Sequence, residues 1–165
     1  VLTTAAKAEL ASPEAMALAH RLMTTLNKAA RDCMVRYAVH ACTDVTGFGL
    51  LGHAFEMAQG SDTHLTLFPG EIDLIPEALE LARDGILPAG MYRNRHYAEA
   101  AVDPGSTELA VQDMLYDPQT SGGLLIAAAP EDAEALLREL RGAVPSAQRI
   151  GVVEAYQGGP RISLR

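Results

Sequence analysis

The spacing of apolar residues along the chain predicts alternating helices and short strands. In the first long segment, Ser12-Pro13-Glu14 favours a helix start, because serine caps helices and proline is tolerated in the first turn. Apolar side chains then return every three or four positions, which places them on one helical face. The residues of this broad face are Ala15, Leu18, Leu22, Leu26 and Ala29, with Met16, Ala19 and Met23 beside them. We expect one helix here, with this face buried against a sheet.

The remaining segments alternate between the two kinds of element. Strands are expected over residues 39–43, 64–67, 124–129, 150–155 and 161–164, and helices from 47 or 48 to 57 and over 76–83, 96–102, 108–115 and 130–141. We expect residues 87–94 to be irregular, because they include Pro88 and Gly90 and show little periodicity. The last two strands are expected to pair across the turn at 157–159. These elements predict a single α+β domain over residues 1–165, with helices covering a mixed or antiparallel sheet.

Composition and charge exclude several classes of protein. The chain has 165 residues, about the length of one domain, and 48% of them are apolar, which suffices for a core. No apolar run approaches the ~20 residues that a membrane helix needs. The formal net charge is −8 and the 13 basic residues are scattered, which disfavours binding to nucleic acid. Cys33 and Cys42 lack the spacing of a zinc site or a disulfide framework, so a reducing cytoplasm is the simplest setting.

A glycine-rich segment from Asp44 to His53, which we call the first motif, follows a predicted strand and leads into a predicted helix. Such a junction places an acidic residue beside free helix N–H groups, an arrangement suited to Mg²⁺ and phosphate. We expect Asp44 to bind the metal and Thr46 and Gly47 to turn hydroxyl and N–H groups toward phosphate. The alternative is structural: Asp44 caps the helix, and the glycines serve a tight turn.

A second polar loop precedes the predicted strand at 124–129, and with the start of that strand it forms the second motif, residues 117–125. We expect this loop to line the mouth of a ligand site, or alternatively to form a turn whose polar side chains satisfy backbone groups. The loop residues with polar side chains or glycine are Asp117, Gln119, Thr120, Ser121, Gly122 and Gly123.

The third motif is the shorter run from Gly90 to Arg95. Asn94 and Arg95, and equally Arg93, are candidates for binding phosphate, since guanidinium groups pair with phosphate oxygens in a bidentate manner. The alternative is that these arginines are solvated surface residues. We expect His53, on the helix beyond Gly47, to be a hydrogen-bonded packing residue rather than a base.

Together the three motifs resemble those of the C-terminal domain of the selenophosphate synthetase (selenide, water dikinase) family. DVTGFGLLGH at 44–53 and DPQTSGGLL at 117–125 are similar to its two C-terminal motifs, and GMYRNR at 90–95 is similar to a third. The resemblance runs from Thr3 to the final Arg165. It implies a fold like the C-terminal domain of aminoimidazole ribonucleotide synthetase, whose superfamily includes this family.

The resemblance also implies an activity. Enzymes of that family make selenophosphate from selenide and ATP, with release of AMP and phosphate, and they are dimeric through their N-terminal domains. The matching aspartate, Asp44, is expected to join N-terminal aspartates around the Mg²⁺ bound to ATP. The reactive cysteine or selenocysteine belongs to the N-terminal domain, so we expect Cys42 to be a buried apolar residue. We expect the present chain to be the C-terminal half of such an enzyme and to be inactive alone.

Two alternatives remain open. One is another ATP-dependent enzyme of the same superfamily, acting on a purine, thiamine or carbamoyl substrate, although the long form of both glycine-rich motifs argues against it. The other is a non-enzymatic module that binds a protein partner or delivers selenium, in which the loops are docking surfaces.

Overall fold

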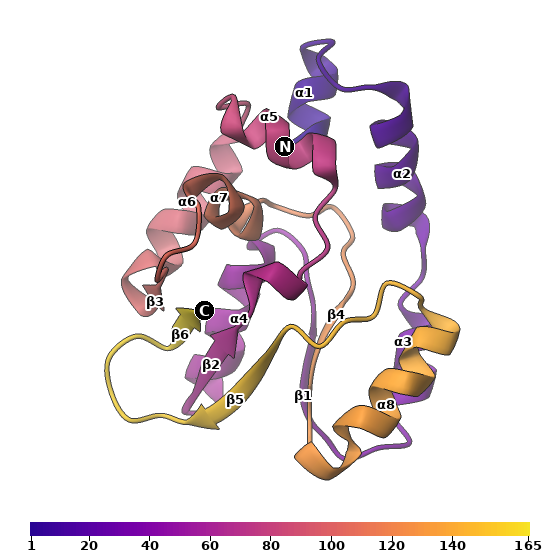
Figure 1. Ribbon diagram of the computed structural model, residues 1–165, viewed down its shortest axis with the longest axis vertical. Helices are drawn as coiled ribbons and strands as arrows, with labels where there is room; N and C mark the ends of the chain where they lie inside the picture. Colours follow the sequence, from indigo (N-terminus) through magenta and orange to yellow (C-terminus); the bar gives the residue numbers. More distant parts are fainter.

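A computed structural model describes residues 1–165 and shows eight α-helices, two 3₁₀ helices and six strands (Figure 1). The helices are α1 (Leu2–Lys7), α2 (Pro13–Thr24), α3 (Lys28–Met34), α4 (Gly49–Gly60), α5 (Pro76–Arg83), α6 (Ala89–Ala98), α7 (Leu109–Tyr116), α8 (Pro130–Ala143), η1 (Pro69–Glu71) and η2 (Glu99–Ala101). The strands are β1 (Val39–Asp44), β2 (Thr63–Leu67), β3 (Val102–Asp103), β4 (Leu124–Ala128), β5 (Gly151–Ala155) and β6 (Ile162–Leu164). The α+β class predicted from the sequence is confirmed.

The strands form two sheets. β1 and β4 make a two-stranded antiparallel sheet, in which Asp44 lies opposite Leu124. The other sheet is mixed and has the strand order β3-β6-β2-β5. Because the antiparallel pair joins the strand before the first motif to the strand after the second motif, the fold brings these two distant segments side by side.

The prediction that the last two strands pair with each other is wrong. β2 lies between them, antiparallel to β5 and parallel to β6. The chain from β5 to β6 therefore makes a wide loop instead of a hairpin (Figure 1). A strand from elsewhere in the sequence fits between them because its inward residues Leu65 and Leu67 are needed to complete the core.

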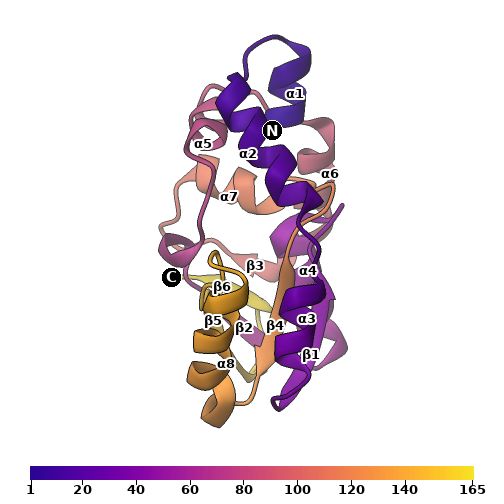
Figure 2. The same cartoon turned by 90° about the vertical axis from the view of Figure 1, so that its right-hand side faces the viewer.

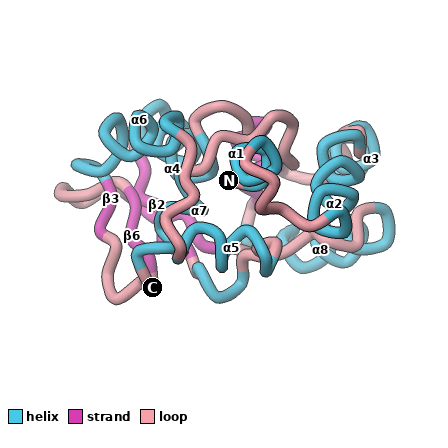
Figure 3. The backbone as a smooth tube through the Cα atoms, turned by 90° about the horizontal axis from the view of Figure 1, so that it is seen from above, coloured by secondary structure: helices cyan, strands magenta, loops and turns pink.

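The main core lies between the mixed sheet and three helices. α4 packs on β2 and β6, and α6 and α7 pack beside α4. The largest fully buried side chains are Leu51, Leu67, Met91, Leu115, Ile162 and Leu164. α3 and α8 form a second layer at the other end, packed on the β1–β4 pair (Figures 2 and 3). None of the helices is long and apolar enough to cross a membrane.

The prediction for the N-terminal helix is wrong in its length and its buried face. α2 ends at Thr24, and a separate helix, α3, begins at Lys28. Ala15 and Ala19 are buried against α1 and α5, not against a sheet, while Leu22 is 46% exposed and Leu26 is 77% exposed. The small alanine side chains allow the helices to approach closely, so α2 packs through one edge of the predicted apolar face, at Ala15 and Ala19, and not through Leu22.

The segment at 87–94 was predicted to be irregular, and this is also wrong. α6 begins at Ala89, directly after Pro88, and runs to Ala98. Its buried residues, Met91, Asn94 and Ala98, have helical spacing, but a polar asparagine in that series concealed the pattern. The helix expected at 96–102 is therefore only the end of α6, followed by η2 and the start of β3. The other predicted helices and strands are confirmed with shifts of at most a few residues at their ends.

Candidate functional site

Backbone hydrogen bonds join the first and second motifs directly. The Val45 N–H donates to the Gly123 carbonyl oxygen at 2.9 Å, and the Gly122 N–H donates to the Val45 oxygen at 3.0 Å. One step further along, the Gln119 N–H donates to the Thr46 oxygen at 2.9 Å. These bonds continue the β1–β4 pairing into the loops, so the two motifs form one structural unit.

Two glycines in this unit are required by close backbone contacts. Gly49 has a positive φ of 68°, and a Cβ there would lie 2.7 Å from the Tyr116 carbonyl carbon. At Gly122 a Cβ would lie 2.4 Å from the Val45 carbonyl oxygen. Because both obstructions are backbone atoms, a larger residue would push the two motifs apart.

Asn94, from the third motif, connects the other two. Its buried side-chain amide donates to the Gly47 carbonyl oxygen and to the Tyr116 carbonyl oxygen, both at 2.9 Å. This uses both of its N–H donors, so only its side-chain oxygen remains for a ligand. Asn94 therefore fixes the relative positions of the loops and of α6.

A cavity of about 470 Å³ opens where the three motifs meet. Its lining residues are Thr46, Gly47, Phe48, His53, Gly90, Arg93, Asn94 and Pro118. Arg93 is exposed and makes no ion pair or hydrogen bond within the chain, so its positive charge is available to an anion at this cavity. The structure thus brings together Thr46, Gly47 and Asn94, as the sequence analysis requires of a shared ligand site.

His53 forms the inner wall of this cavity. It is buried, its Nε2 lies 3.1 Å from the Thr46 hydroxyl oxygen, and its Nδ1 lies 3.2 Å from the Glu56 carboxylate. Its ring also packs at a tilt against Phe48, with 5.5 Å between ring centroids. His53 is therefore a hydrogen-bonded packing residue, as predicted, and it orients the Thr46 hydroxyl.

Arg95 does not reach this cavity. On helix α6 it lies two residues from Arg93, and two residues correspond to about 200° of rotation, so the two guanidinium groups point to opposite sides. Arg95 forms an ion pair with the buried Asp113 and lies over the Tyr116 ring, 5.5 Å from its centroid. Sequence reasoning grouped Arg95 with Asn94 because it expected an irregular loop instead of a helix.

Asp44 lies exposed at the end of β1 and makes no side-chain hydrogen bond or ion pair. It does not cap α4, because that helix begins only at Gly49 and has no side-chain cap. No group of three or more His, Cys, Asp or Glu residues is arranged to hold a metal ion. Mg²⁺ is usually bound through one or two carboxylates together with substrate phosphates. A lone exposed carboxylate such as Asp44 could hold Mg²⁺ only together with ligands from outside this chain.

Cys42 was predicted to be buried, and this is wrong. It is exposed on the same face of β1 as Asp44, because alternate strand residues share a face. Partial desolvation of the thiol, with the nearby Asp44 charge, raises the pKa of Cys42 above its usual value. The thiol therefore stays protonated at neutral pH, which makes it a poor nucleophile.

The second motif contributes to the cavity through Pro118. The Asp117 carboxylate is turned away and accepts hydrogen bonds at 2.9 and 2.8 Å from the Val1 nitrogen. Gln119, Thr120 and Ser121 are exposed and their side chains make no hydrogen bonds within the chain, so the proposed turn-stabilising role of these side chains is not observed. The backbone of the loop, at Gly122 and Gly123, supplies its contacts instead.

Sequence reasoning did not single out three residues that line the cavity, Phe48, Gly90 and Pro118. Phe48 is 45% exposed and stacks on Tyr97, with 5.5 Å between ring centroids. The available signal was the position of Phe48 between Gly47 and Gly49. A large aromatic side chain in a turn is expected to pack against a neighbouring element, which here is Tyr97 of α6.

The chain is thus an α+β domain whose glycine-rich loops are hydrogen-bonded to one another beside a polar cavity. Residues 2–161 match the family model of AIR synthase related protein, C-terminal domain, and the chain belongs to that family. Among its curated relatives, the protein from Citrifermentans bemidjiense is 45% identical over 160 residues, which is 97% of this chain and 46% of the relative. The relatives from Treponema denticola and Caldanaerobacter subterraneus are 44% and 47% identical over 140 residues, 85% of this chain and 40% and 41% of their own lengths.

All three of these relatives are named selenide, water dikinase. The chain thus spans less than half the length of the curated relatives it matches. Its similarity is to the part of those enzymes that carries the C-terminal domain of the family.

Proposed function

We propose that this chain acts as the C-terminal half of a selenide, water dikinase, an enzyme that makes selenophosphate from selenide and ATP and releases AMP and phosphate. The observation that carries the proposal is the identity of 45% to such an enzyme over 97% of the chain. Alone the chain is inactive, since phosphoryl transfer depends on positioning and charge neutralisation by a complete site.

In this proposal Asp44 supplies one carboxylate to the Mg²⁺ that accompanies ATP. Bound Mg²⁺ would neutralise phosphate charge and orient the phosphoryl group for transfer. The support is the state of the carboxylate: Asp44 is exposed and has no partner within the chain.

The cavity at the three motifs holds phosphate oxygens in this proposal. Arg93 supplies positive charge, while the Thr46 hydroxyl, oriented by His53, donates or accepts one hydrogen bond. Gly47 allows the ligand to approach the backbone, because a Cβ at this position would meet no atom within 4 Å. Of the two candidate arginines, Arg93 lines this cavity and Arg95 does not, so we assign the phosphate contact to Arg93. The exposed polar residues of the second motif, 119–121, are left free to meet a neighbouring domain.

The remaining ligands and partners follow from the same assignment. The partner of this chain is the N-terminal domain of the enzyme, which supplies the other aspartates and the reactive cysteine or selenocysteine, and the whole enzyme is a homodimer of the cytoplasm. Selenide is the small-molecule substrate. The proposal requires neither nucleic acid nor a membrane.

The test is a chimera in which this chain replaces the matching C-terminal part of the Citrifermentans bemidjiense relative. We expect selenide-dependent formation of AMP from ATP, and its near-complete loss in Asp44→Asn, which keeps the shape of the side chain but not its charge. Asp84→Asn is the matched control, because Asp84 is also exposed and has no ion pair. Full activity of Asp44→Asn would refute the metal role, and an inactive, folded chimera beside an active parent would refute the proposed function.

A further inference from the structure

Three side chains form a series of contacts that ends at the cavity of the three motifs. The Thr46 hydroxyl oxygen lies 3.1 Å from His53 Nε2, and His53 Nδ1 lies 3.2 Å from a carboxylate oxygen of Glu56. Thr46 and His53 line the cavity, whereas Glu56 lies about one helical turn further along α4, is 43% exposed and does not line it. Glu56 can therefore influence the cavity only through His53.

The Glu56 carboxylate determines which nitrogen of the neutral His53 ring carries the proton. An ionised carboxylate has only acceptor sites, so an unprotonated Nδ1 at 3.2 Å would bring two acceptors together. The proton is therefore assigned to Nδ1, which leaves Nε2 as an acceptor. Burial of the ring and its packing against Phe48 hold the two nitrogens in these positions.

This tautomer fixes the direction of the Thr46 hydroxyl. Because Nε2 accepts, Thr46 donates the hydrogen bond between them and uses its only hydroxyl proton. The lone pairs of the Thr46 oxygen are then what the hydroxyl offers to a ligand. Asn94 is in the same state, because both N–H groups of its amide are used within the chain and only its oxygen remains. Both side chains thus present acceptors to the cavity.

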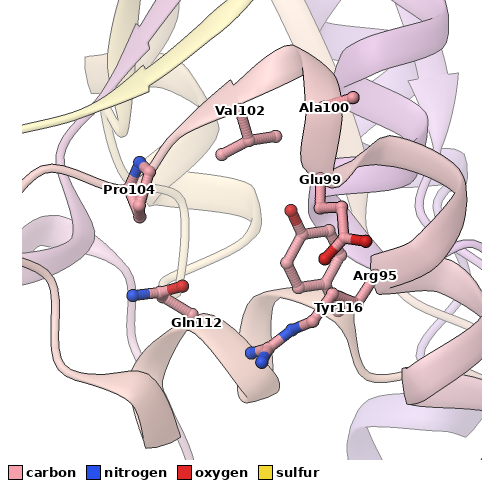
Figure 4. Close-up of a pocket in the computed structure, with 7 residues that line it drawn as sticks. All are labelled: Arg95, Glu99, Ala100, Val102, Pro104, Gln112 and Tyr116. Carbon is pink, nitrogen blue, oxygen red and sulfur yellow. The ribbon is translucent and has the colours of Figure 1, made fainter.

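Positive charge at the cavity comes from another residue. Arg93 is the only lining residue with a permanent charge, whereas Arg95 lies with Gln112 and Tyr116 in a separate cavity of about 310 Å³ (Figure 4). Ionised phosphate oxygens accept hydrogen bonds and do not donate them, so they suit Arg93 but not the Thr46 oxygen. The ligand group that contacts Thr46 must carry a donor, and water is the smallest group that does.

We infer that Glu56 is a positioning residue, which acts through His53 to make the Thr46 oxygen the acceptor for a reactant water molecule. The inference rests on the proposed function, because release of AMP together with free phosphate consumes one water molecule. As the water oxygen bonds to phosphorus and the bond from phosphorus to the AMP oxygen breaks, the water proton passes to Thr46 while the Thr46 proton passes to His53 Nε2. The positive charge that forms on the ring then faces the Glu56 carboxylate.

The first test measures the tautomer of His53 in this chain, by two-bond ¹H–¹⁵N correlation at about pH 8, above the ordinary pKa of about 6.5 for histidine. We expect the Nδ1–H form. Glu56→Lys places a donor beside Nδ1, and we expect the Nε2–H form to predominate in that variant. Glu131→Lys is the matched control, because Glu131 is exposed and makes no ion pair, and it should leave the tautomer unchanged. An Nε2–H form in the unsubstituted chain would overturn the inference.

The second test is steady-state kinetics of the chimera described above. Thr46→Val keeps the shape of the side chain without its hydroxyl. We expect kcat to fall about tenfold or more while KM for ATP stays unchanged, because Arg93 still binds the phosphates. Thr46→Ser, which keeps a hydroxyl, should recover most of the loss. Glu56→Lys should lower kcat in the same way, and Glu131→Lys should not.

Three results separate this inference from its rivals. A raised KM for ATP with unchanged kcat in Thr46→Val would mean that the hydroxyl binds phosphate, and would overturn the inference. Unchanged kinetics of Glu56→Lys, with folding checked by circular dichroism, would remove Glu56 from the site. An inactive unsubstituted chimera would refute the proposed function instead, and the tautomer of His53 in this chain would still decide whether Glu56 sets the direction of the Thr46 hydroxyl.

Discussion

The buried Asn94 amide donates to the Gly47 carbonyl oxygen at 2.9 Å, so a residue of helix α6 holds the turn that precedes helix α4. The same amide also holds the Tyr116 carbonyl oxygen at the end of α7. One side chain therefore fixes three segments that are far apart in the sequence, and the geometry of the candidate site depends on it.

Asn94→Ala should destabilise the chain because it leaves two carbonyl oxygens without their donor. The expected loss is about 2–4 kcal/mol of unfolding free energy, measured by urea denaturation. Asn27→Ala is the control, because Asn27 makes a single bond, to the Gly122 oxygen at 3.0 Å, and is only half-buried. If the two substitutions cost the same, Asn94 does not have the bridging role described above.

Gly49→Ala should be destabilising, whereas Gly60→Ala at the other end of α4 should be neutral or stabilising. Gly49 has a positive φ and has no space for a Cβ beside the Tyr116 backbone, while nothing lies within 4 Å of a Cβ at Gly60. We expect a loss above about 2 kcal/mol at Gly49, and a gain of up to about 1 kcal/mol at Gly60 from helix propensity. Thermal denaturation followed by circular dichroism compares the two. Equal melting temperatures would contradict the close contact between the motifs.

Leu22→Ala should have little effect, although its sequence pattern marks it as a core residue. The side chain is 46% exposed, whereas Leu51 is fully buried in the main core. We expect less than about 1 kcal/mol for Leu22→Ala and about 2–5 kcal/mol for Leu51→Ala, both from denaturant unfolding. A large cost at Leu22 would mean that α2 packs through the face predicted from periodicity.

Stability should fall in acid, in part through Glu77. The Ser12 hydroxyl and N–H donate to its carboxylate and hold the pKa of Glu77 below the 4.5 of an unperturbed glutamate. A lowered pKa in the folded state means that the stabilisation is complete above the unfolded-state pKa and disappears as the pH falls through the folded-state pKa. The difference in unfolding free energy between the unsubstituted chain and Glu77→Gln should therefore shrink as the pH falls below 4.5, the ordinary glutamate pKa. A constant difference would contradict this linkage.

Arg93→Gln and Arg95→Gln should have different consequences in the chimera described above. Arg93 has no partner, so its loss should leave stability unchanged but reduce ATP turnover at least tenfold if it binds phosphate. Arg95→Gln leaves the buried Asp113 without its ion pair and should cost about 2–4 kcal/mol of unfolding free energy. Unimpaired turnover of the Arg93 variant would remove Arg93 from the proposed phosphate site.

The sequence predicted the parts of the site that depend on local chemistry. Glycines beside Asp44 and before Leu124 indicated tight turns at strand ends, and the alternation at 64–67 indicated β2, because both patterns reflect the backbone preferences of a few neighbouring residues. It also gave the α+β class. It failed at α2 and α6, where alanine and asparagine, residues that carry little hydrophobic signal, form the buried faces.

Sequence pattern alone thus determined where the glycine-rich turns fall, which residues carry charge, and that the domain mixes helices with short strands. Only the tertiary structure decided which of these meet: that Arg93 and not Arg95 shares a cavity with Thr46, and that β2 separates β5 from β6. The physical reason is that helix rotation and strand order are set by packing between segments distant in the chain. The spacing of apolar residues indicates which face of a segment prefers to be buried, but not which other segment packs against that face.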